Sequence, residues 1–207
     1  MKFFPIMGDR YSVDDFAHLD LSVHSSPYYN VDNINLQSLK TYVAEVKVEC
    51  NAKLLYGGYL EQRAIYTSEH FTGETRDIHL GIDVWAAAGT PLYAPTEMIL
   101  HSMAYNAAEL DYGYTLIYFI PEMDVHLLLG HLSKSSIINK EVGMKANAKN
   151  EIAWLGNPSE NGGWEPHVHI QLIKNMGDLK GDYPGVCRQS DLDYYQSNCP
   201  DPTRIIF

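Results

Sequence analysis

Apolar residues recur at spacings of three and four between Leu36 and Val46, in the segment NLQSLKTYVAEVKVEC. This spacing places them on one face of a helix. Asn35 stands directly before the first of them, and asparagine is a preferred residue at helix N-termini. The sequence therefore predicts a helix capped by Asn35, within a partly helical N-terminal extension of residues 1–55.

From residue 56 onward the pattern changes to short runs of β-branched and aromatic residues separated by Gly, Pro and Asn. The runs are GIDVW, TPLYAP, MILHSMAY, YTLIYFI, VHLLLGHLS, EIAWLG and HVHIQLI. Such runs are typical of strands, and several carry apolar residues on both faces, as in a sandwiched or closed sheet. We expect a mainly β domain over residues 56–207. Its tail, residues 177–207, is expected to be loop-like chain packed on the body, with a turn at CPDP.

A chain of 207 residues with 45% hydrophobic residues suits one globular domain with an extension. Its net charge of −11 and the lack of a Lys/Arg cluster make nucleic acid and anionic membranes poor partners. No apolar run reaches the length of a signal peptide core or a membrane span.

The cysteines are Cys50, Cys187 and Cys199, an odd number without CxxC spacing, which argues against a disulfide framework or a thiolate metal site. These features predict a cytoplasmic protein. Cys50 is expected to be a small buried hydrophobic residue.

Four of the nine histidines stand in short motifs, in RDIHLGIDVW, LLLGHLSKSS and WEPHVHIQL. HVHIQLI reads as a strand, so His167 and His169 share one face while Val168 points the other way. The two imidazoles can then be ligands of one metal ion, or they can simply be two polar side chains on a solvated strand face. The other five, His18, His24, His70, His101 and His126, are expected to be surface or locally hydrogen-bonded residues.

His79 and Asp83 are four residues apart, but Gly81 and its β-branched neighbours disfavour a helix. A straight strand would separate them by about 13 Å, so binding one ion requires a turn near Gly81. Two imidazoles and one carboxylate are a usual ligand set for catalytic zinc, with water in the fourth position. Magnesium and calcium favour more oxygens, and structural zinc favours four protein ligands, commonly cysteines.

The segments HLGID, GHLS and PHVHIQL, in this order, resemble the HxxxD, HLS and HxH motifs of lysostaphin-type zinc metallopeptidases over residues 56–173. AGTPLYAP matches a further segment of that family. The resemblance implies zinc (Zn²⁺) ligands at His79, Asp83 and His169, and a catalytic pair at His131 and His167. It also implies antiparallel split-barrel-like sheets (the duplicated hybrid motif), with the metal in a groove walled by loops near residues 104–113 and 156–166.

A closer resemblance covers residues 18–207, through DLSVHSS, GGYLEQRAIYTSEHF, RDIHLGIDVWAAAGTPLYAP, ENGGWEPHVHIQLI, PGV and CPDP. These segments are similar to the peptidase-like middle domain of bacterial proteins that also carry a kinase-like and a class III aminotransferase domain. This resemblance implies a kinase-like or aminotransferase partner. LGNPSENGGWEPHVHIQL departs from the Gly-rich pattern of the wall-lytic enzymes, which predicts a groove of different shape.

The resulting hypothesis is a zinc-dependent hydrolase, a metalloendopeptidase that attacks a peptide carbonyl with an activated water. His131 and His167 would orient the water and pass a proton to the leaving amine. Two alternatives stay open: a non-catalytic zinc or small-ligand module that serves an associated kinase or aminotransferase, and a zinc hydrolase of small amide or phosphate-linked metabolites. Asp77 and Glu165 are candidates to support a ligand histidine, and Trp85 and Trp164 are expected in the core or at the rim.

Overall fold

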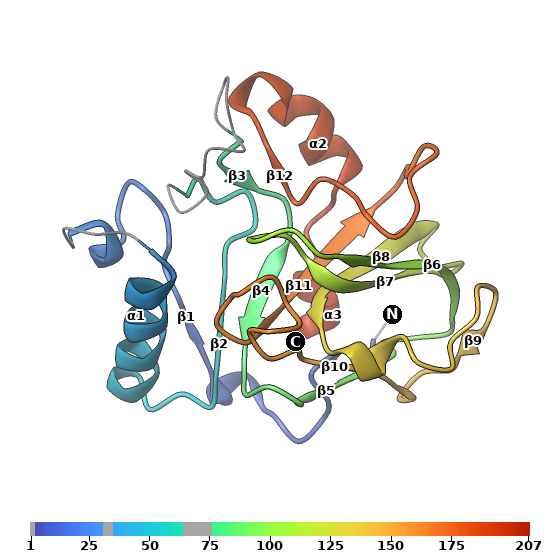
Figure 1. Cartoon of the computed structure of the whole chain (residues 1–207), viewed down its shortest axis with the longest axis horizontal. Coiled ribbons are helices and arrows are strands. Elements are labelled where there is room, and N and C mark those ends of the chain that lie inside the picture. The colour runs from blue at the N-terminus through green and yellow to red at the C-terminus, as the bar shows by residue number, and fades with distance from the viewer. Residues whose placement is uncertain (1–2, 31–34, 64–75) are drawn as a thin grey trace.

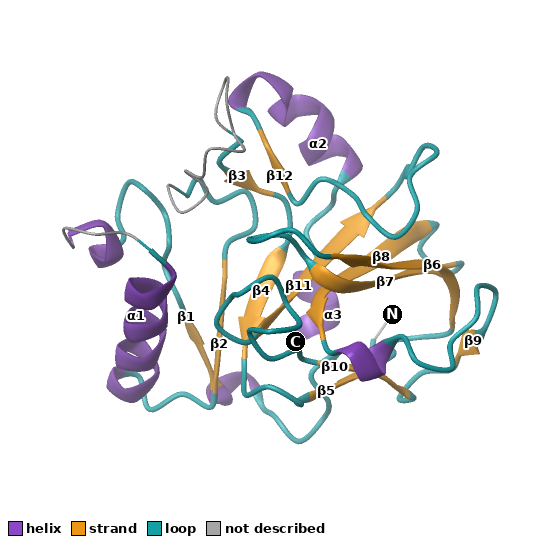
Figure 2. Ribbon diagram, in the orientation of Figure 1, coloured by secondary structure: helices purple, strands orange, loops and turns teal. Residues whose placement is uncertain are grey.

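A mixed eight-stranded sheet forms the centre of the molecule (Figures 1 and 2), in a computed structural model that describes residues 3–30, 35–63 and 76–207. Its order is β1 (Phe16–His18), β2 (Leu54–Gly57), β4 (Ile82–Trp85), β11 (His167–Ile173), β8 (Val125–Leu132), β7 (Gly113–Ile120), β6 (Met98–Asn106) and β9 (Lys145–Ala146). Every neighbouring pair is antiparallel except β1 and β2, which are parallel. The expected mainly β, antiparallel fold is confirmed.

Two small antiparallel sheets complete the β structure, β5 (Pro91–Tyr93) with β10 (Glu151–Trp154) and β3 (Ile78–His79) with β12 (Val186–Cys187). All seven runs singled out in the sequence contain strands. The helices are α1 (Leu36–Glu49), α2 (Leu192–Asn198) and α3 (Thr203–Ile206), with short 3-10 turns at Val13–Asp15, Pro27–Asn30, Lys134–Ser136 and Gln189–Asp191. Within the described residues, no helix combines the length and the apolar character needed to span a membrane.

Apolar side chains cover both faces of the large sheet, as its sequence pattern predicts. Alternate residues of β11, among them Val168 and Ile170, belong to the main core, which also includes side chains of β5 and β10. The opposite face carries a smaller cluster that includes Leu128 of β8 and Ile173 at the end of β11. The sheet is therefore buried on both sides.

Helix α1 begins where the sequence predicts. The Asn35 side chain accepts hydrogen bonds from the backbone N–H groups of Gln37 and Ser38. Leu39 and Val43 are its buried residues and pack with Trp85 and Trp164 in a third apolar cluster. The prediction for Cys50 is wrong: the helix ends at Glu49, and Cys50 at its C-cap is exposed because it lies one turn beyond Val46, the last residue of α1 that packs.

The tail is more regular than expected, because residues 177–207 contain β12, α2 and α3. Leu192 and Tyr195 of α2 pack on the second apolar cluster, and Ile205 and Ile206 of α3 are fully buried in the main core. The tail does pack on the body, as predicted. Residues of the N-terminal segment also enter the cores, and the division at residue 55 stays a prediction.

Candidate metal and catalytic site

Three neighbouring strands of the large sheet carry most of the site. Asp83 on β4 lies directly opposite His169 on β11, and His169 in turn lies opposite Gly130 on β8. His167 and His169 share the face of β11 away from the main core, where Val168 is buried. Strand pairing thus brings residues separated by 86 positions to adjacent places.

His79 reaches the same point from the small β3–β12 sheet, because the chain bends at Gly81 between β3 and β4. The predicted turn is therefore present. Glycine is needed at this position because there is no space for a side chain. A Cβ at Gly81 would lie 2.6 Å from the carbonyl oxygen of Ile170 and 2.8 Å from Nε2 of His169. Only a residue without a side chain lets β11 approach this closely.

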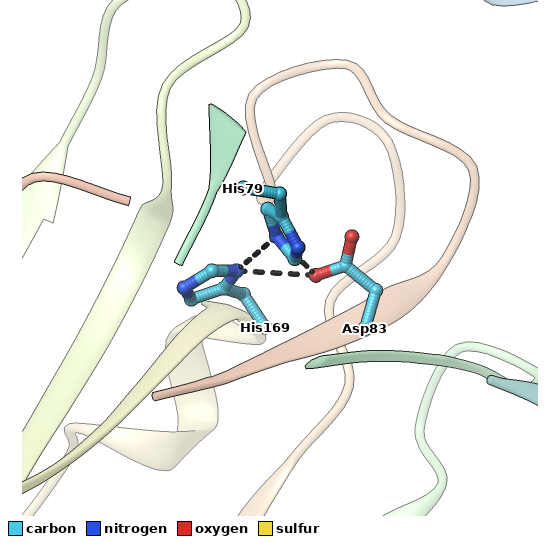
Figure 3. A group of neighbouring side chains, drawn as sticks. All are labelled: His79, Asp83 and His169. Atoms are coloured by element: carbon cyan, nitrogen blue, oxygen red, sulfur yellow. Dashed lines mark hydrogen bonds and ion pairs between the residues drawn. The ribbon is translucent and has the colours of Figure 1, made fainter. Parts of the chain in front are cut away.

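Three buried side-chain atoms converge at the centre (Figure 3). His79 Nε2 lies 2.9 Å from His169 Nδ1 and 3.3 Å from Asp83 Oδ1, and His169 Nδ1 lies 3.1 Å from the same carboxylate oxygen. Each of the three residues is at most 3% exposed. These residues can hold a metal ion through one atom each.

In the rings of His79 and His169, the nitrogen that faces away from the cluster is hydrogen-bonded to an oxygen atom that can only accept. His79 Nδ1–H donates to the carbonyl of Gly58 over 2.8 Å, and His169 Nε2–H donates to Oε1 of Gln171 over 2.8 Å. The Gln171 amide is oriented because its Nε2 donates to the carbonyl of Pro184. In the neutral form of each ring, the lone pair therefore lies on the inner nitrogen, beside a carboxylate oxygen. Three acceptors at this separation suit a shared cation.

Burial and nearby charges set the protonation states of His79 and Asp83. Burial, followed by the charge of Arg63, lowers the pKa of His79 to about 4. Burial opposes ionisation of Asp83, but the charges of protonated His79 and of Arg63 outweigh it and hold the pKa of Asp83 well below its usual range. At neutral pH His79 is therefore a neutral imidazole and Asp83 an ionised carboxylate.

Arg63 supports the carboxylate from behind and was not anticipated from the sequence. Its Nη1 donates to Asp83 Oδ2 over 2.6 Å, its Nε donates to Glu61 Oε2 over 2.6 Å, and its Nη2 donates to the carbonyl of Gly57. Gly58 has a φ of +99°, and a Cβ there would collide with the guanidinium. The Gly57–Gly58 turn thus positions both the Arg63 guanidinium and, through Gly58, the His79 ring.

His131 lies at an irregularity in the β7–β8 pairing, between the pairs Tyr114–Leu132 and Leu116–Leu129. Its φ of 61° is in the left-handed region, which is uncommon for a residue with a side chain. A bulge of this kind redirects a side chain out of the regular alternation of the strand. The His131 ring lies 4.2 Å from the ring of His167, centroid to centroid.

His131 and His167 are oriented in the same way. Nδ1–H of His131 donates to the carbonyl of Asn161 over 2.9 Å, and Nδ1–H of His167 donates to the carbonyl of Glu165 over 2.7 Å. Burial, with the nearby His167 second, lowers the pKa of His131 well below its usual value, and burial also lowers the pKa of His167. Both rings are neutral at pH 7, with their lone pairs on Nε2. His167 Nε2 lies 4.0 Å from Asp83 Oδ1, directly beside the cluster.

A cavity of about 350 Å³ opens onto all five residues. Its wall includes Leu110, Asp111 and Tyr112 from one expected loop and Trp164 from the other. Two further parts of the wall were not anticipated: residues 182–186 of the tail, and Leu39 of α1. Neither part contains a candidate metal ligand or catalytic residue, although PGV at residues 184–186 is one of the segments that carry the closer resemblance.

The remaining expectations have mixed outcomes. Glu165 supports His167 through its backbone carbonyl, whereas the Asp77 carboxylate accepts a hydrogen bond from Gln62 and does not contact a ligand histidine. Among the other histidines, His18 and His24 are exposed, and His101 and His126 are partly buried. His70 lies outside the described residues.

No protein-family model matches the chain, and no curated protein matches its sequence. Among solved structures, the catalytic domain of the antimicrobial peptidase lysostaphin from Staphylococcus simulans is similar at 19% identity, over 68% of this chain and 88% of that chain, with a TM-score of 0.42. The catalytic domain of the prophage-encoded M23 protein EnpA from Enterococcus faecalis is 22% identical over 62% and 88% of the two chains, with a TM-score of 0.44. These TM-scores lie below 0.5, so the functional assignment rests on the side chains described above.

Proposed function

We propose that this protein is a zinc-dependent hydrolase that cleaves an amide bond of a peptide or a small amide. The observation that carries the proposal is the convergence of three buried acceptor atoms, from His79, Asp83 and His169, beside two neutral histidines. Histidine with one carboxylate is the donor set of many catalytic zinc sites, and it leaves one coordination position for water.

The spacing of the donor atoms supports zinc. Ligand bonds of about 2.0 to 2.1 Å in tetrahedral geometry place donor atoms about 3.3 Å apart. The three separations here are 2.9, 3.1 and 3.3 Å. Calcium and magnesium would favour additional oxygen donors, and the carboxylate of Asp83 is the one acidic group of the cluster.

Bound zinc would supply Lewis acidity that makes water acidic enough to act as a nucleophile near neutral pH. The Nε2 lone pair of either His131 or His167 would be free to accept one proton from a water in the cavity, because the Nδ1 atom of each ring is already occupied as a donor. The protonated ring can return the proton to the leaving nitrogen of the amide. Arg63 would hold Asp83 in place through its ion pair with Oδ2.

As part of this proposal we place the protein in the cytoplasm. The three cysteines are free thiols, which suits a reducing compartment. A kinase-like or aminotransferase partner stays a hypothesis that rests on sequence resemblance alone.

Metal content is the first test. Elemental analysis of the purified protein should give one zinc per chain, and the variants His79→Ala and His169→Ala should each lose it. His101→Ala is the matched control, because His101 lies away from the cavity. Absence of zinc from the wild-type protein, even after supplementation, would contradict the proposal.

The catalytic role has its own test. His131→Ala should keep zinc and lose hydrolysis of any peptide or amide that the wild-type protein cleaves, by about 10²- to 10⁴-fold. Full activity in a zinc-loaded His131→Ala variant would remove His131 from the mechanism. If the wild-type protein holds zinc but cleaves none of a panel of peptides and amides, a non-catalytic zinc-binding module becomes the better account.

A further inference from the structure

One wall of the cavity is apolar and is assembled from separate parts of the chain. Leu39 of α1, Trp85 of β4, Leu110 and Trp164 line it. Leu39, Trp85 and Trp164 are 3%, 4% and 5% exposed and belong to the same apolar cluster. Leu39 reaches this wall because α1 packs on the same cluster, and Leu110 packs against that cluster as well.

The apolar wall lies directly beside the proposed catalytic pair. The Trp85 ring stacks on the His167 ring at 5.5 Å and 24°, and the Trp164 ring meets the same imidazole edge-on at 6.3 Å. A group held against this wall therefore lies next to the proposed catalytic pair.

Another part of the cavity wall is acidic. Asp111 and Asp182 both line it, and neither forms an ion pair with a basic side chain in the part of the chain that the structure describes. Asp182 is exposed as a residue, yet desolvation of its carboxyl group and the nearby charge of Asp111 raise its pKa. The exposed Arg76 also lines the cavity. The two carboxylates of Asp111 and Asp182 are therefore opposed by the one guanidinium of Arg76.

We infer that the substrate is an amide that carries a bulky apolar side chain next to the scissile bond, packed against Leu39, Trp85 and Trp164, and a protonated amine near Asp111 and Asp182. This inference rests on the proposed function, because the cleaved bond is placed by the zinc site. A cavity of about 350 Å³ is within the range that encloses a small ligand. The net charge of −11 adds a general attraction for a cationic substrate.

Four hydroxamates test the inference on the zinc-loaded protein, because the hydroxamate group binds zinc and the remainder of each molecule varies. Phenylalanine hydroxamate carries both features, N-acetylphenylalanine hydroxamate lacks the charged amine, glycine hydroxamate lacks the side chain, and acetohydroxamate lacks both. Binding is measured by calorimetry and by tryptophan fluorescence, and the metal-free protein is titrated in parallel. Phenylalanine hydroxamate should bind at least about 10-fold more tightly than glycine hydroxamate, from burial of the ring.

Two variants test the contributions of the acidic wall and the apolar wall separately. Asp182→Asn should weaken phenylalanine hydroxamate about threefold to fivefold and leave the acetylated probe unchanged, and Asp178→Asn, an exposed neighbour that does not line the cavity, is its control. Leu39→Ala should reduce the preference for phenylalanine over glycine, whereas Val43→Ala, in the same helix and cluster but off the cavity, should keep it.

Equal affinity for the phenylalanine and glycine probes would overturn the inference, as would an Asp182→Asn variant that binds the free amine as well as the wild type does. Both results leave the proposed function standing if binding needs zinc. If no hydroxamate binds in a zinc-dependent way, the proposed function fails and the inference fails with it.

Discussion

Arg63 determines how well Asp83 can serve as a ligand, because its guanidinium occupies the carboxylate oxygen that faces away from the cluster. Partners of this kind fix the orientation of a ligand, and their loss typically weakens metal binding about 10- to 100-fold. Arg63→Met should therefore weaken zinc binding by that factor in a competition titration with a chelator. Arg63→Lys should retain part of the affinity, since it keeps the charge but loses the fork of donors.

A double variant separates this positioning role from a general effect on folding. Arg63→Met leaves the side chains of Glu61 and Asp83 without their ion-pair partner, which destabilises the fold. Adding Glu61→Gln removes one of these two unpaired charges and should restore part of the unfolding midpoint while zinc binding stays weak. Recovery of zinc affinity together with stability would show that Arg63 acts through the fold alone.

His126 should make stability depend on pH away from the site. Its ring packs on His101 at 4.7 Å and on Phe119 at 5.2 Å, and burial, with the His101 charge second, lowers its pKa. The unfolded chain, with a histidine pKa near 6.5, then binds more protons than the folded chain. The contribution of His126 is present above pH 6.5 and is lost as the pH falls through the folded pKa.

Urea unfolding between pH 7.5 and pH 5 measures this effect. His126→Phe should lose less stability over that range than the wild-type protein, whereas His24→Gln, at an exposed position, should follow the wild type. A wild-type slope in His126→Phe would assign the acid sensitivity to other groups.

The residues that the sequence could identify are those whose spacing is set by local chain geometry. HVH places two imidazoles on one face of a strand, independently of the rest of the fold. His79 and Asp83 come together through a single bend of the chain between them. Arg63 was missed because its partner Asp83 is 20 residues away in sequence. Gln171 is only two residues from His169 on the same strand, but the direction of its amide depends on the distant Pro184. A supporting contact across strands leaves no periodic signal in a single sequence.

At the scale of elements, apolar runs predicted seven of the twelve strands that the structure describes and the helix α1, because each buries a face that its own sequence defines. Helix α2 in the tail was not predicted, because it is only 7 residues long and its Tyr-rich sequence has no clear helical period. Its helical form depends on packing of Leu192 and Tyr195 against the second apolar cluster. Short elements that are stabilised by tertiary contact are the ones that local pattern misses.

Helix α1 offers a test of capping that bears on the cavity. Asn35 accepts two backbone hydrogen bonds at the start of the helix, and its own N–H donates to Ser38 Oγ. Replacing such a cap with alanine costs about 1 kcal/mol. Asn35→Ala should lower the free energy of unfolding by about that amount in urea denaturation, while Lys40→Ala, exposed on the same helix, should stay within about 0.5 kcal/mol of the wild type. Equal effects of the two changes would mean that the cap contributes nothing.

At the scale of the whole molecule, the two ends of the chain are bound to each other. The N–H of Ile6 donates to the carbonyl of Ile205 over 2.9 Å, and the rings of Phe16 and Phe207 meet at 4.8 Å. Phe3, Ile6 and Met7 lie in the main core with β5 and β10. Contacts between such distant positions cannot be read from the sequence, where the first 55 residues look like an extension.

Deleting residues 1–55 should therefore abolish cooperative folding of the remainder. The deletion removes β1 and α1, strips Leu54 and Leu55 from β2, and uncovers Trp85 and Trp164. The fragment 56–207 should show no sharp thermal transition and should bind a dye for exposed apolar surface. Supplying residues 1–55 as a separate chain should restore a transition in part, because the contacts are non-covalent. A fragment that unfolds cooperatively near the temperature of the full chain would instead make residues 1–55 a separable extension, and Leu39 dispensable to the fold that holds the site.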